Sequence, residues 1–237
     1  MELKHPHIHI DITEGRYPKR FIYLLVSLLT FLFGTLFIPP AFSQYLSPIF
    51  LLQFTFAGII LFRNHHRLIY RVIVLMAFML LVIEGFKMAS LSSRTAVLIG
   101  DFTYFLYFSV MTFEVFRQII LARTIDFNMV AGSFCGFIML GMLGSFALTA
   151  IEMVSPGAFS GINTNSFNET FQDMVYYSFV SILTIGYGDI LPVTQTARKA
   201  SMLLGILGYF YNIFVIGITI STFMQQRRRP KVEKKDE

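Results

Sequence analysis

The sequence predicts an all-α membrane protein with six transmembrane helices and a short re-entrant helix and loop before the last of them. Of its 237 residues, 55% are hydrophobic and only 14% are charged. A soluble domain carries about a quarter charged residues. The apolar residues also form long uninterrupted blocks, which are typical of bilayer spans, in place of an alternating or 3.6-residue pattern.

Each long apolar block predicts one span. The blocks are residues 21–38, 48–62, 68–86, 96–116, 127–151 and 200–224. Pro39 and Pro40 end the first block because proline cannot continue a helix, whereas Pro48 is tolerated in a first helical turn. Cys135 is the single cysteine and lies inside an apolar block, so no disulfide within the chain is expected.

The basic residues predict the orientation of these spans. With the amino terminus in the cytoplasm, most of the 19 Lys and Arg residues fall in cytoplasmic segments, as the positive-inside rule requires. Only Lys87, Arg94, Arg198 and Lys199 fall on the other side. We therefore expect a multi-pass protein of the cell membrane with both termini cytoplasmic. The net charge of +5 is no signal for nucleic acid, because the basic residues flank apolar blocks.

A shorter segment, residues 171–183, predicts a helix that enters the membrane and returns. Its 13 residues give roughly 20 Å of helix, too short for a hydrocarbon core about 30 Å thick. Thr170 and Asp173 have the spacing of a capping box at its start. Its carboxyl end would point into the membrane, where the negative end of the helix dipole favours a cation.

The hexapeptide Thr-Ile-Gly-Tyr-Gly-Asp, residues 184–189, follows this helix directly. Gly186 and Gly188 alternate with larger residues, and glycine adopts backbone angles closed to other residues. A strand of this kind aims successive carbonyls the same way. Four such strands around an axis would give rings of oxygens that replace the water around a dehydrated cation.

Residues 176–189, Tyr-Tyr-Ser-Phe-Val-Ser-Ile-Leu followed by this hexapeptide, resemble the potassium-channel pore family, and the resemblance extends over about residues 128–224. It implies that potassium ions bind the main-chain oxygens of the filter and need no cofactor. The filter residues are Thr184, Ile185, Gly186, Tyr187 and Gly188. Because the chain holds one such segment, the resemblance implies a homotetramer in membrane lipid with no nucleic-acid partner.

The resemblance also assigns supporting residues, with two departures from the family pattern. Asp189 would lie at the outer mouth, with Tyr176 and Tyr177 in the place of the aromatic residues, often Trp, that donate to the filter. Leu183 stands where the family commonly has Thr, which removes a ring of hydroxyls. Gly208 lies where the family places a gating hinge, although close helix packing explains such a glycine equally well.

The resemblance divides the chain into four parts. Residues 1–20 form a cytoplasmic tail, 21–123 a four-helix bundle placed like a voltage sensor, 124–224 the pore domain with outer helix, pore helix, filter and inner helix, and 225–237 a basic cytoplasmic tail. His5, His7 and His9 have the spacing of a metal site on a strand, but the absence of a pairing partner favours a solvated tail.

The charges of the bundle do not suit a voltage sensor. No Lys or Arg lies between residues 96 and 116 of the fourth span, and steep voltage gating needs 3–4 charges per subunit. Glu84, Asp101 and Glu114 lie in or near the third and fourth spans. Ion pairs between Asp101 and Arg94 and between Glu114 and Arg117 would give these carboxylates a structural role. The alternative is an ion- or proton-sensing site.

These observations predict a passive, non-enzymatic potassium channel with little voltage dependence. Two other classes of protein stay open. A potassium transporter subunit usually carries four degraded pore repeats in one chain, and a receptor or scaffold with a vestigial pore has no reason to keep an intact filter. This chain has one well-formed filter segment, which favours the channel.

Overall fold

The computed structural model describes residues 19–37, 53–54, 57–59, 61, 67–88, 94–120, 127–217, 220–221 and 224. Its elements are almost all helical. They are α1 (Arg20–Phe33) with a 3-10 turn (Gly34–Phe37), α3 (Arg67–Met88), α4 (Arg94–Ile120), α5 (Phe127–Val154), β1 (Phe159–Ser160), α6 (Phe167–Ile182), β2 (Leu191–Pro192), α7 (Gln195–Phe210) and a π-helical turn (Tyr211–Ile216).

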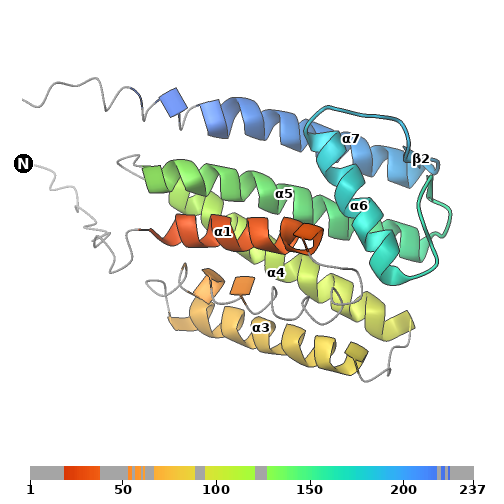
Figure 1. Cartoon of the computed structure of the whole chain (residues 1–237), viewed down its shortest axis with the longest axis horizontal. Helices are drawn as coiled ribbons and strands as arrows, with labels where there is room; N and C mark the ends of the chain where they lie inside the picture. The colour runs from red at the N-terminus through yellow and green to blue at the C-terminus, as the bar shows by residue number, and fades with distance from the viewer. Residues whose placement is uncertain are drawn as a thin grey trace, which may run out of the picture.

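Helix α5 lies at the centre of the arrangement (Figure 1). Helices α1 and α4 pack against it, α3 packs against α4, and α7 packs against α5 as well. Helix α6 crosses the end of the bundle at a steep angle, between α5 and α7. The amide of Phe21 donates to the side-chain oxygen of Asn128 at 3.0 Å. This bond places the starts of α1 and α5 at the same end of the molecule.

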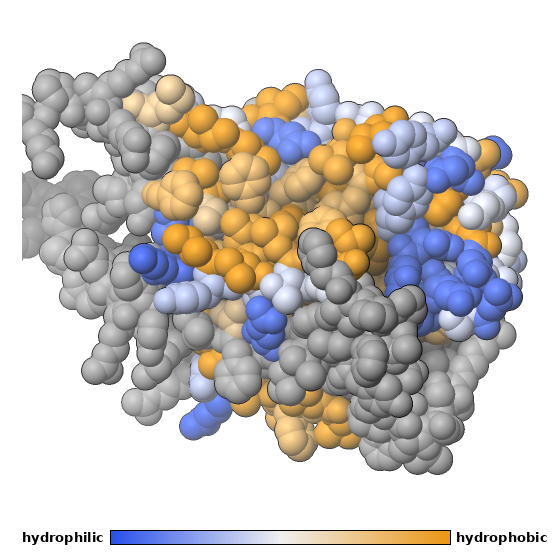
Figure 2. Space-filling view, viewed as in Figure 1, coloured by the Kyte–Doolittle hydropathy of each residue, from blue (hydrophilic) through white to orange (hydrophobic). Residues whose placement is uncertain are grey.

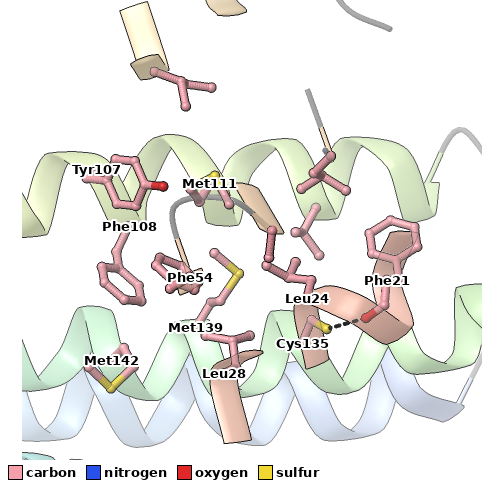
Figure 3. Close-up of a cluster of buried hydrophobic side chains, with 14 of the residues drawn as sticks. Phe21, Leu24, Leu28, Phe54, Tyr107, Phe108, Met111, Cys135, Met139 and Met142 are labelled. Carbon is pink, nitrogen blue, oxygen red and sulfur yellow. Dashed lines mark hydrogen bonds between the residues drawn. The ribbon is translucent and has the colours of Figure 1, made fainter. Parts of the chain in front are cut away.

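Aromatic and sulfur-containing side chains fill the core between α1, α4 and α5 (Figure 3). Phe54 stacks on Phe108 at 4.8 Å between ring centroids, and Phe108 contacts Phe146 of α5 at 5.3 Å. Phe146 in turn contacts Phe171 of α6 at 4.9 Å. A continuous series of rings therefore joins the amino-terminal helices to the start of α6, across the predicted boundary at residue 123.

A second, smaller core lies under the loop-rich end, between α5, α6 and α7. Its buried members are Leu148, Ala158, Phe159, Met174, Tyr177, Ile182, Ile190, Ala197 and Leu204. Because residues on both sides of the 184–189 segment belong to this core, the segment is held at its two ends by apolar packing.

Within the described residues, one helix is both long and apolar enough to cross a membrane. Helix α5 has 28 residues and a mean hydropathy of 2.0 over its most apolar stretch. Arg20–Phe33 and Tyr70–Val82 are apolar but shorter. The predicted second span, residues 48–62, lies largely outside the described residues, so the prediction of six spans stays a prediction. Figure 2 shows hydrophobic surface over the middle of the molecule and hydrophilic surface at the end where α6 begins.

The predicted boundaries of two helices are wrong. Helix α6 begins at Phe167, not at residue 171, because Ser166 caps it by accepting from the amide of Glu169 at 3.2 Å. Thr170 and Asp173 form no capping box; Asp173 accepts from the amide of Asn163 at 2.7 Å. Helix α7 begins at Gln195, not at residue 200, behind a Thr194 cap. At 16 residues, roughly 24 Å, α6 stays shorter than a bilayer core.

Candidate functional site

Helix α6 ends directly at the Thr184–Asp189 segment and the chain folds back on its last turn. The amides of Ile185 and Gly186 both donate to the carbonyl of Val180, at 3.0 and 3.4 Å, and the amide of Thr184 donates to Ser181 at 3.1 Å. The segment therefore starts next to the carboxyl end of α6. The partial negative charge of that helix end favours a cation nearby.

The φ angle of the backbone alternates in sign along this segment, so successive residues have left- and right-handed conformations. Thr184, Gly186 and Gly188 have positive φ angles of 58°, 60° and 79°, whereas Ile185 and Tyr187 between them do not. A backbone whose φ alternates in sign gathers like groups on one side, either amides, as in an anion-binding nest, or carbonyls, as in a cation filter. Thr184 is the one residue other than glycine with positive φ among those described, a conformation that costs about 1–3 kcal/mol and is concentrated at functional sites.

The same segment is open on the side away from α6. A Cβ atom added to Gly186 or Gly188 would meet nothing within 4 Å. Tyr187 is 70% exposed and Ile185 48% exposed, so the Tyr187 ring does not pack on the pore helix of its own chain. A single chain thus presents the carbonyl-bearing strand at its surface.

Tyr176 and Asp189, two of the predicted supporting residues, lie in contact. The Tyr176 hydroxyl donates to Asp189 Oδ2 at 2.6 Å, and the amide of Ile190 donates to Asp189 Oδ1 at 3.1 Å. The hydrogen bond from Tyr176 lowers the pKa of Asp189 below its ordinary value. The same bond raises the pKa of Tyr176 to about 12. This pair ties the segment after the glycines to the pore helix.

The Tyr177 side chain makes its described contacts outside residues 184–189, and its predicted support of the filter stays a prediction. Its ring is buried and contacts Phe159 of β1 at 5.5 Å between centroids. Its hydroxyl donates to Ser201 of α7 at 2.9 Å. Adjacent helical residues point about 100° apart, so Tyr176 and Tyr177 face different neighbours.

Two side chains of α6, Ser178 and Phe179, pack against glycines of α5. The Ser178 hydroxyl donates to the carbonyl of Gly141 at 2.6 Å. A Cβ at Gly141 would lie 2.6 Å from the Phe179 ring, and one at Gly144 would lie 2.6 Å from Ser178 Oγ. The signal was visible as glycines three residues apart in an apolar helix, a spacing that permits close helix contact.

Glu152 is the second feature that sequence reasoning missed. Its carboxylate is 4% exposed and accepts from the amides of Gly157 at 2.7 Å and Phe159 at 3.0 Å. The loop held in this way continues as β1. This strand pairs antiparallel with β2, which begins directly after Asp189 and Ile190. One buried carboxylate at the end of α5 thus positions the strand that follows the filter segment.

Gly208, the predicted hinge, lies buried against the end of α6. A Cβ there would lie 2.7 Å from the Cβ of Ile182. Gly205 and Gly217 of the same helix have open space around them. Gly208 is therefore explained by close packing, and whether it also bends stays untested.

The acidic residues of the bundle differ in what the structure describes. Glu114 is buried and pairs with Arg117 at 3.2 Å, as predicted. Asp101 is buried, but the side chains of Arg94 and Glu84 lie outside the described part of the chain. His5, His7, His9, the predicted amino-terminal tail up to residue 18 and the tail from residue 225 lie outside it as well. Within the described residues, no three His, Cys, Asp or Glu side chains gather as metal ligands do.

Comparison with known proteins shows that the region around this site is similar to ion channels. Residues 138–225 match a family model described as ion channel, and they include most of α5, all of α6 and α7, and the alternating segment. The chain is also 36% identical over 66 residues to the potassium channel K2 of Plasmodium falciparum (isolate 3D7). This alignment covers 26% of the chain and 4% of that much longer protein. The region that holds α6, α7 and the alternating segment is therefore similar to ion-channel pores, and part of the chain is similar to a potassium channel.

Proposed function

We propose that the chain is a subunit of a potassium-selective channel and that four copies enclose the conduction path. The carbonyls of residues 184–187 would bind dehydrated potassium, and the Thr184 hydroxyl would face the cytoplasmic end. The observation that carries this proposal is the alternation of backbone hand over Thr184–Gly188. Such a strand offers a row of oxygens on one side, as a filter needs.

Four copies are proposed because one chain supplies one strand. In the single chain this strand is open, and the neighbouring helix α7 is exposed and apolar. Exposed side chains on α7 include Met202, Leu203, Ile206 and Leu207. A closed ring of identical subunits would cover such a face and bring four strands to one axis. Mass determination of the complex in detergent should give four copies, and a conducting monomer or dimer would overturn the arrangement.

The proposed orientation puts the filter outside and both termini in the cytoplasm. Ser160 is exposed in the loop after α5, whereas the single native cysteine, Cys135, is buried. A Ser160→Cys variant in intact cells should react with a thiol reagent that does not cross the membrane. The unmodified chain is the control for Cys135. If the variant is labelled only after the cells are opened, Ser160 lies in the cytoplasm and the proposed orientation is wrong.

The decisive experiment compares two glycines that both have open space around them. Gly186 has positive φ and Gly205 does not, so only Gly186→Ala strains the backbone. That strain is about 1–2 kcal/mol in each of four strands. In liposomes that hold this protein alone, we expect a potassium flux from which sodium is excluded. The potassium flux should fall at least tenfold in Gly186→Ala and change little in Gly205→Ala. Equal sodium and potassium flux in the unmodified protein would contradict the filter, and no flux would favour a vestigial pore or a transporter subunit.

We also propose that voltage changes the open probability little. Each charge that crosses the field contributes ~2.3 kcal/mol per 100 mV, and steep gating needs 3–4 charges per subunit. Helix α4 carries Arg94 and Arg117 near its ends, and Arg117 is paired with Glu114. The slope of open probability against voltage in a planar bilayer tests this. A steep slope that is lost on neutralising Arg63, Arg67 and Arg71 would assign the sensor to that row.

A further inference from the structure

The inner helix changes its hydrogen-bond pattern partway along its length. Helix α7 ends at Phe210, and residues Tyr211–Ile216 continue it as a π-helical turn. Fewer than about 1% of residues in proteins are π-helical, and such turns are found at functional sites and at sharp helix bends. The weak point of this helix therefore lies after Tyr211.

Tyr211, the first residue of the π-helical turn, is bound more closely than its neighbours. It is 4% exposed, whereas Tyr209 and Phe210 are 57% and 54% exposed. Its hydroxyl donates to the carbonyl oxygen of Ser133 in α5 at 2.6 Å. Its ring lies 5.2 Å from that of Phe116 in α4 and 5.9 Å from that of Phe137 in α5. One side chain thus joins three helices.

Gly136 makes room for this side chain. A Cβ atom at Gly136 would collide with the Tyr211 hydroxyl and would lie 2.9 Å from the Phe116 ring. The glycine lets the phenol reach the backbone of α5, where a helical carbonyl keeps a second lone pair free for another donor. The contact thus depends on Gly136 of α5 and on Tyr211 of the π-helical turn.

We propose that Tyr211 is a positioning residue which holds the π-helical turn against α5 and α4, so that the inner helix bends at Tyr211–Ile216. Because Phe116 lies at the end of α4 next to the Glu114–Arg117 pair, a movement of α4 reaches the inner helix through this ring. The proposal rests on the proposed channel function for its consequence, which is a change in gating. It places the bend beyond Gly208, whose packing on Ile182 explains that glycine.

The test compares two tyrosines of the inner helix that lie two residues apart. Tyr211→Phe keeps the ring and removes the hydrogen bond, while Tyr209→Phe removes an exposed hydroxyl. Loss of one buried hydrogen bond changes an equilibrium by roughly two- to tenfold. In single-channel recordings we expect the ratio of open to closed time to change by that factor in Tyr211→Phe and to stay unchanged in Tyr209→Phe. Equal ratios in the two variants would overturn the proposal.

A second measurement needs no conduction. Hydrogen–deuterium exchange of the amides of Tyr211–Ile216 in the purified protein should quicken by roughly two- to tenfold in Tyr211→Phe and not in Tyr209→Phe. If the protein does not conduct, the proposed function fails while this measurement still decides the Tyr211 contact. Unchanged exchange in Tyr211→Phe would show that the hydroxyl does not hold the turn.

The contact with α4 has its own test. If Tyr211 receives its position from Phe116, Phe116→Leu and Tyr211→Phe act through one contact, and their effects on the open-to-closed ratio should not multiply. The double variant is expected to differ from the stronger single variant by less than about twofold. Independent, multiplying effects would disconnect α4 from the turn.

Discussion

The two ends of the pore region are held by different chemistry. At the end that carries the Thr184–Asp189 segment, hydrogen bonds fix the backbone: Glu152 holds the loop after α5, and Tyr176 holds Asp189. At the opposite end, rings pack around Tyr211 with a single hydroxyl contact. Hydrogen bonds are directional, whereas apolar contacts tolerate sliding. This difference suits an end that must keep its geometry and an end that must move.

The largest expected effect is at Glu152. Its buried carboxylate accepts two amides, and Glu152→Gln replaces one accepting oxygen with a donor that faces an amide. An unsatisfied buried group costs about 1–3 kcal/mol, and more where a charged partner was lost. We expect a lower melting temperature of the detergent-solubilised protein.

The matched control for this prediction is Glu169→Gln. Glu169 is exposed in the first turn of α6, where its charge interacts with the helix dipole by about 0.3–1 kcal/mol. Equal melting temperatures for the two variants would mean that the outer end does not depend on the Glu152 bonds, and the contrast between the two ends would be lost.

A smaller effect is expected at Gly208, which lies between the two ends. Gly208→Ala forces a methyl group against Ile182 and should lower stability by about 1–3 kcal/mol, as overpacking does. Gly205→Ala, with open space, should be neutral or slightly stabilising. Thermal unfolding of both variants measures the difference.

The rescue variant sharpens this prediction. Ile182→Gly removes the Cβ atom that lies 2.7 Å from the new methyl group, whereas Ile182→Ala would keep it. The Gly208→Ala, Ile182→Gly double variant should therefore be more stable than the sum of the single changes predicts. A Gly208→Ala variant with unchanged stability but altered gating would instead support a hinge at Gly208.

The residues that sequence reasoning placed well are those with local signals. The alternating glycines predicted the unusual backbone at Gly186 and Gly188, and the apolar block predicted α5. The start of α6 was misplaced because its first turn is polar. Ser166 and Glu169 nevertheless have the capping-box spacing, so this error was avoidable.

Other features depend on tertiary contact and have no local signal. Glu152 looks like a solvated carboxylate beside a polar loop, and only the fold brings two amides onto it. The family resemblance assigned Tyr176 and Tyr177 to the filter together, and only the fold shows that the Tyr177 hydroxyl donates to Ser201 of α7. Tyr211 resembles any other aromatic residue of an apolar block until α4 and α5 are placed around it.

The smallest expected effect concerns external acid, and it tests the hydrogen-bonded end directly. Tyr176 stabilises the charged form of Asp189 and lowers its pKa. The stability that this hydrogen bond contributes is therefore fully present above the ordinary carboxyl pKa. It is lost as the pH falls through the lowered pKa of Asp189. Potassium flux should stay constant from neutral pH down to about 4.

In Tyr176→Phe the pKa of Asp189 should return toward its ordinary value, so the loss of flux should begin at a higher external pH. Tyr177→Phe is the matched control, because its hydroxyl meets Ser201 and not Asp189. Flux measured against external pH in liposomes of fixed internal pH compares the three proteins. An identical acid profile for Tyr176→Phe and the unmodified chain would mean that the Tyr176 bond does not govern the outer mouth. If the acid profile of the flux shifts only in Tyr177→Phe, the buried Tyr177 and not Tyr176 determines the acid sensitivity.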